Sequence, residues 1–91
     1  MSTLHVLSHS PFSDTRLDSC LRILGRGDAL LLCGDAVYAL QQSSTLEDKT
    51  VFALEEDLQA RNIECPQWAV AIDYPAFVDL SIQYDKVNSW L

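Results

Sequence analysis

The sequence predicts a small three-layer α/β domain, in which a mostly parallel sheet of four to five strands has helices on both faces. Runs rich in strand-forming residues alternate with helix-like segments along the chain, which is typical of parallel strands joined by helical crossovers. Residues 29–33 (ALLLC) are continuously apolar, as expected for a strand buried on both faces. The 91 residues suffice for a single domain spanning residues 1–91, and a hydrophobic content of 48% provides for its core.

The first strand is predicted at residues 3–7 (TLHVL), and a helix follows at residues 14–24. Ser13 or Asp14 suits the N-cap of this helix, since short polar side chains there accept hydrogen bonds from the first backbone N–H groups. The helix has one apolar face and glycines beyond its end, namely Leu17, Leu21 and Leu24, then Gly25 and Gly27. These features predict a strand–helix unit with the leucine face on the sheet.

The remaining elements continue the alternation. Strands are predicted at residues 29–33, 50–54 and 68–74, and helices at residues 36–40, 55–62 and 75–84. Acidic residues open the helix at 55–62 and Arg61 lies in its last turn, which matches the helix dipole. Pro75 suits the first position of a helix because its ring needs no backbone N–H. Right-handed crossovers are expected throughout.

Charge and cysteine usage exclude several classes of protein. The net charge of −7 argues against direct nucleic-acid binding, which depends on Lys and Arg at the phosphates. Three cysteines without a CxxC pair disfavour a zinc site and a disulfide framework. No apolar segment has the length of a signal peptide or a membrane span. The sequence therefore predicts a cytoplasmic protein with free thiols, no metal and no cofactor.

Candidate sites lie where strands end, because ligands of open α/β sheets bind beyond the carboxyl ends of the strands. No GxGxxG, P-loop or GxSxG pattern occurs, which disfavours nucleotide binding and serine hydrolysis. Five carboxylates follow predicted strands, namely Asp35, Glu55, Glu56, Asp57 and Asp73. They suit acid–base work or metal binding, but carboxylates at these positions more often cap the next helix.

The thiols and the C-terminus carry the other candidates. Cys33 ends an apolar run and is predicted to be a core residue, whereas Cys65 precedes a proline in a predicted loop. Cys20 lies at the edge of the leucine face, and Arg16, one helical turn earlier, favours its thiolate form. From these residues alone, packing is the stronger interpretation of Cys20. The terminal Trp90–Leu91 pair predicts docking either on the edge of the sheet or on a partner.

Taken together, five segments resemble the DsrH/TusB family of small sulfur-relay subunits. They are LHVLSHSPF (4–12), LDSCLRIL (17–24), DALLLCGDAVYAL (28–40), FALEEDLQARNI (52–63) and IDYPAFVDLSIQYDKVNSWL (72–91). Their order and spacing carry the resemblance, which covers nearly the whole chain and implies a DsrEFH-like fold. It further implies a heterohexamer with two copies each of three related subunits, in which DsrE/TusD-like and DsrF/TusC-like chains are the partners.

The resemblance also implies a role. Such complexes pass sulfur as a cysteine persulfide, and in TusBCD systems TusA-like and TusE-like carriers link the complex to 2-thiolation of the tRNA wobble uridine. The alternatives are a DsrEFH-type subunit in intracellular sulfur oxidation and a stand-alone thiol sulfurtransferase that uses Cys20. The main sulfur-carrying cysteine of the family belongs to the DsrE/TusD-like subunit, so this chain is expected to be non-catalytic or accessory.

Cys20 matches the position of a cysteine in DsrH-type members. The resemblance therefore makes Cys20 a candidate persulfide carrier, with Arg16 as its electrostatic aid. The alternative hypothesis is that the protein is a purely structural scaffold, in which Cys20 carries no sulfur. No membrane contact is expected, and any contact with tRNA is expected to be indirect.

Overall fold

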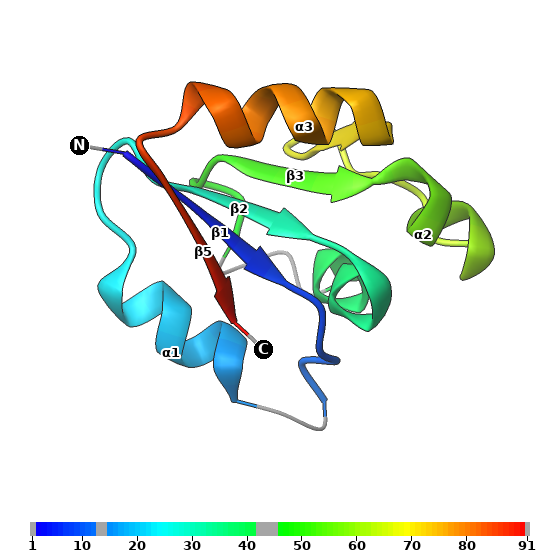
Figure 1. The fold of residues 1–91 in the computed structure, drawn as a ribbon. Coiled ribbons are helices and arrows are strands. Elements are labelled where there is room, and N and C mark those ends of the chain that lie inside the picture. Colours follow the sequence, from blue (N-terminus) through cyan, green and yellow to red (C-terminus); the bar gives the residue numbers. More distant parts are fainter. Residues whose placement is uncertain (1, 13–14, 42–45, 91) are drawn as a thin grey trace.

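A computed structural model describes residues 2–12, 15–41 and 46–90, and these form one five-stranded sheet with helices on both faces (Figure 1). The elements are β1 (Thr3–Leu7), α1 (Arg16–Ile23), β2 (Ala29–Leu32), the 3-10 helix η1 (Gly34–Gln41), β3 (Val51–Leu54), α2 (Glu55–Ala60), β4 (Val70–Ile72), α3 (Tyr74–Gln83) and β5 (Lys86–Trp90). The strand order is β4-β3-β2-β1-β5, and every pairing is parallel. This architecture confirms the predicted α/β fold class.

The core is divided by the sheet into two clusters. Side chains of α1, η1 and α2 pack with those of β1, β2 and β3 on one face, and α3 covers the other face (Figure 1). The central strand β2 contributes to both, because successive side chains of a strand point to opposite faces. Leu30 and Leu32 belong to the first cluster, while Ala29 and Leu31 belong to the second. All four are buried, which confirms the burial on both faces predicted for residues 29–32, whereas Cys33 lies beyond the strand and is half-buried.

The end of the chain forms a strand that the sequence pattern does not assign. Strand β5 pairs in parallel with β1, with Leu4 opposite Val87 and Leu7 opposite Trp90. Its residues are mostly exposed and polar, so no apolar run marks it. Trp90 fixes its end, since the indole Nε1 donates a hydrogen bond to Nδ1 of His5 at 3.1 Å. Of the two predicted alternatives, Trp90 adopts docking on the edge of the sheet. Leu91 lies outside the described residues.

Most elements differ from their predicted bounds by one or two residues, and the helix predicted at residues 36–40 is the 3-10 helix η1. Two of these differences have local reasons. Strand β4 is shorter than the predicted strand because Asp73 is the N-cap of α3, where its carboxylate accepts the backbone N–H of Ala76 at 3.0 Å. Helix α2 ends before the predicted residue 62 because Asn62 has a φ of 54°. The N–H of Ile63 then donates to the carbonyl of Leu58 at 3.0 Å, which completes a Schellman motif.

Helix α1 matches the predicted leucine face. Leu17 is buried, and Leu21 and Leu24 pack against the same cluster. The proposed N-cap residues Ser13 and Asp14 lie outside the described residues. Among the described residues, no helix has the length and apolar character needed to cross a membrane.

Candidate functional site

The carboxylates beyond β2 and β3 form a structural network. Asp57 on α2 accepts the backbone N–H of Gly34 at 2.8 Å, which ties the start of η1 to α2. Arg61 donates to Asp35 at 2.9 Å and lies 3.7 Å from the carboxylate of Asp57. The guanidinium lies close to both carboxylates and offsets part of their negative charge, so these acids stabilise the connection of η1 and α2 and are poorly placed for acid–base chemistry.

The other carboxylates have equally local roles. Asp73 caps α3, while Glu55 and Glu56 lie exposed in the first turn of α2, where negative charge suits the helix dipole. His9, between two serines of the loop after β1, is exposed. In the described ranges, no group of three or more His, Cys, Asp or Glu side chains is arranged to hold a metal ion.

Cys20 lies on the inward face of α1 and is completely buried. Burial, and then the negative charge of Asp28, raise the pKa of the Cys20 thiol to about 12. Arg16 begins the same helix one turn away, and the thiolate form that this spacing predicts is not favoured in the closed fold. The carrier role of Cys20 stays a prediction, and it requires the thiol to be uncovered first.

A polar cluster beside Cys20 was not visible in the sequence pattern; we call it the His5 cluster, consisting of His5, Asp28 and Trp90. His5 is only 3% exposed. Because the indole N–H is a donor only, Nδ1 of His5 accepts its bond, and Nε2 carries the proton toward Asp28 at 3.4 Å. The cluster joins the first strand, the turn before β2 and the last strand, which are distant in the sequence.

Asp28 is held as a carboxylate by backbone donors. The N–H groups of Gly25 and Thr3 each donate to it at 2.9 Å. The bond from Gly25 is the largest cause that lowers the pKa of Asp28, followed by the bond from Thr3 and the interactions with His5. A fixed negative charge therefore lies close to Cys20, which disfavours a second anion there, whether a thiolate or a persulfide.

The two remaining thiols are also protonated. Cys33 donates to the carbonyl of Leu7 at 3.4 Å, and burial and then Asp57 raise the pKa of its thiol. Cys65 donates to the carbonyl of Ala69 at 3.5 Å, and partial burial raises the pKa of its thiol as well. None of the three thiols has the electropositive, accessible surroundings that activate a cysteine.

The chain matches the family model described as "DsrH like protein" over residues 9–87. The chain belongs to the DsrH family. Proteins named TusB from Salmonella arizonae and Salmonella typhimurium are each 37% identical to it over 95 aligned positions, which cover 96% of this chain and 99% of the relative. The resemblance stated from the sequence is therefore confirmed.

A solved structure supports the same fold. The crystal structure of the ychN protein from E. coli superposes with a TM-score of 0.75 and covers 99% of this chain and 100% of that chain. The sequence identity is 17%, so this likeness concerns the fold alone.

Proposed function

We propose that the chain is a subunit of a cytoplasmic sulfur-relay complex of the TusBCD type, which supports 2-thiolation of the tRNA wobble uridine. The observation that carries this proposal is the 37% identity to TusB proteins over nearly the full length of both chains. The partners in this proposal are DsrE/TusD-like and DsrF/TusC-like subunits. TusA-like and TusE-like carriers exchange sulfur with the complex.

The surroundings of the thiols support an accessory role for this subunit. With a pKa of about 12, only about one Cys20 side chain in 10⁵ is a thiolate at pH 7. A stand-alone sulfurtransferase needs an accessible thiolate as nucleophile. The isolated chain is therefore expected to show no thiosulfate sulfurtransferase activity, and the principal carrier is expected on a partner subunit.

A role of Cys20 in the relay has a defined structural condition. The Cys20 thiolate attacks the terminal sulfur of a donor persulfide, a new S–S bond forms at Cys20, the donor S–S bond breaks, and the donor thiolate leaves. No external oxidant or reductant is needed. Cys20 is buried between α1 and the sheet, and the negative charge of Asp28 lies near it. This step therefore requires α1 to move away from the sheet.

A DsrEFH-type role in intracellular sulfur oxidation is the second candidate. One observation favours it, which is that the family model matched over residues 9–87 is described as "DsrH like protein". The two roles separate in the host. Loss of a TusB-type subunit is expected to lower the 2-thiouridine content of tRNA, whereas loss of a DsrH-type subunit is expected to impair the oxidation of reduced sulfur compounds.

The test is purification of the tagged chain from its native host, with native mass measurement of what accompanies it. The proposal expects two small DsrE-family chains in amounts equal to this one. Recovery of the chain without either of them contradicts the proposal. In the same host, Cys20→Ala leaves 2-thiouridine at its normal level if Cys20 only packs, and lowers it if Cys20 carries sulfur.

A further inference from the structure

Helix α3 is apolar on both its inner and its outer side. On the inner side, Phe77 and Leu80 pack against the sheet. On the outer side, Tyr74, Val78 and Ile82 follow at intervals of four residues and are 57%, 49% and 76% exposed. A helix that is apolar all round is normally covered on both sides, so this outer row lacks its cover in the isolated chain.

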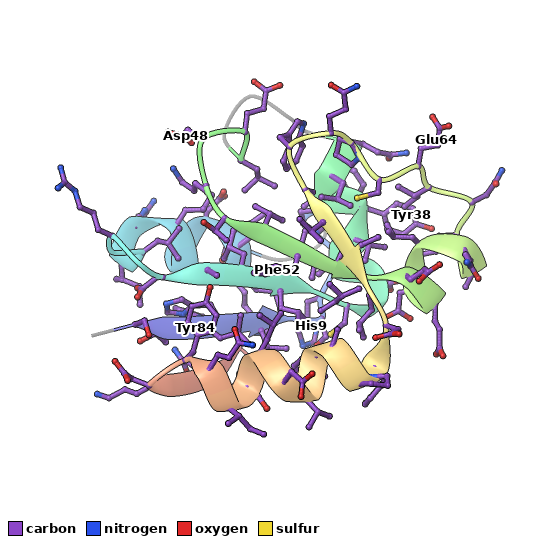
Figure 2. All side chains as sticks on the ribbon, turned by 90° about the horizontal axis from the view of Figure 1, so that it is seen from above. His9, Tyr38, Asp48, Phe52, Glu64 and Tyr84 are labelled. Carbon is purple, nitrogen blue, oxygen red and sulfur yellow. The ribbon has the colours of Figure 1, made fainter. Side chains whose placement is uncertain are left out.

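Two further apolar side chains lie on the face of the sheet that carries α3. Val70 on β4 is 53% exposed and pairs with Phe52 on β3, which is half-buried. Phe52 belongs to the cluster beneath α3, so both side chains lie on the α3 face. Figure 2 shows α3 along one side of this face, where it leaves most of β3 and β4 uncovered. We call the combined area the α3 surface, consisting of Phe52, Val70, Tyr74, Val78 and Ile82.

The charged residues of the segment that forms β4 and α3 are all acidic. From residue 70 to residue 85 the chain contains Asp73, Asp79 and Asp85, all exposed, and no Lys or Arg. Lys86 comes next, but its strand neighbour Val87 pairs with Leu4 of the α3-side cluster, so Lys86 points to the opposite face. The α3 surface is therefore apolar with an acidic border.

This charge distribution decides which kind of partner fits. A second copy would bring two acidic borders together, in a chain of net charge −7, and like charges across an interface are unfavourable. A partner with an apolar contact face and Lys or Arg around it would match both the centre and the border. We propose that the α3 surface docks a different subunit whose contact face is apolar with a basic border. This inference rests on the proposed function, since the relay complex supplies that subunit.

The first test uses two exposed isoleucines in the last turns of helices on opposite faces of the sheet. Ile82→Glu places a charge in the α3 surface, and Ile23→Glu places the same charge on α1. Binding is measured between the full chain and the co-purified DsrE/TusD-like and DsrF/TusC-like subunits of the same host. Ile82→Glu is expected to weaken the affinity by at least about tenfold, and Ile23→Glu by less than about twofold. Thermal melting of each variant confirms that it folds.

The second test addresses the acidic border. Asp79→Lys is expected to weaken binding by about tenfold and to reduce the loss of affinity on raising the salt concentration. Asp18→Lys on α1 is the matched control, because Asp18 is also exposed on a helix. Equal effects of the two charge reversals contradict the basic border.

The outcomes separate this inference from the proposed function. Failure of the unmodified chain to bind either subunit contradicts both. Tight binding that Ile82→Glu leaves unchanged contradicts the α3 surface alone and leaves the relay subunit standing. Sedimentation that shows a dimer of the isolated chain, dissociated by Ile82→Glu, assigns the surface to a second copy and overturns the proposed partner.

Discussion

Replacing Trp90 with Phe tests how the C-terminal strand is held. The substitution keeps an aromatic ring in the half-buried position but removes the indole N–H that donates to Nδ1 of His5 at 3.1 Å. His5 is 3% exposed, so water cannot readily replace the lost donor. A buried acceptor without a partner costs about 1–3 kcal/mol. For a chain of this size, each kcal/mol lowers the melting temperature by about 4–8 °C.

The expected result is a loss of about 2 kcal/mol in the free energy of unfolding, measured by urea denaturation with circular dichroism. Trp68→Phe is the matched control, because Trp68 packs against the same cluster and loses the same atoms. A double-mutant cycle with His5→Phe isolates the bond, since Trp90→Phe then has no acceptor to orphan. Equal losses for Trp90→Phe and Trp68→Phe, or no coupling in the cycle, refute the claim that this hydrogen bond fixes β5.

Three further predictions follow from the described contacts. Above pH 9 the Cys20 thiol loses its proton in the unfolded chain but keeps it in the folded chain, where its pKa is about 12, so the free energy of unfolding decreases from pH 9 toward pH 12. Urea titrations are expected to show a smaller decrease for Cys20→Ala. Asp28 has a lowered pKa in the folded state, so its carboxylate stabilises the fold above its unfolded pKa of 3.8, and this stabilisation is lost as the pH falls through the folded value. Asp28→Asn is expected to lower the melting temperature at pH 7 and to make the melting temperature depend less on pH in the acid range. Gly34 has a φ of 53°, and a methyl group there would meet the carbonyl oxygen of Ser8 at 3.2 Å, so Gly34→Ala is expected to lower the free energy of unfolding, measured by urea denaturation, by about 1–2 kcal/mol. Gly25→Ala, whose methyl group would make an ordinary contact at 3.5 Å, is expected to lower it less.

Much of the fold is predictable because it is encoded locally. The apolar run of β2, the leucine face of α1 and Pro75 at the start of α3 each specify their element within a few residues. Strand β5 has no such signal, since four of its five residues are exposed. It pairs with β1 because its backbone completes that edge and because Trp90 reaches His5, a contact between residues 85 positions apart. The periodicity of apolar residues along the sequence cannot reveal a contact between two residues so far apart.

The candidate site shows the same division. The helix of Cys20 and the position of Arg16 one turn earlier follow from the sequence. The state of the thiol depends instead on burial under the sheet and on Asp28, which comes from the turn before β2. Asp28 in turn is fixed by Thr3 and Gly25. Local spacing therefore identifies the candidate thiol, while its protonation is set by groups that only the tertiary fold brings near it.

The most direct test of the proposed role is the 2-thiouridine content of tRNA in the native host, measured by mass spectrometry of digested tRNA. We expect deletion of the gene to abolish most of the 2-thiolated wobble uridine, and expression of the unmodified chain to restore it. A deletion strain with the normal content of 2-thiouridine would contradict the assignment of this chain to the tRNA-thiolation relay.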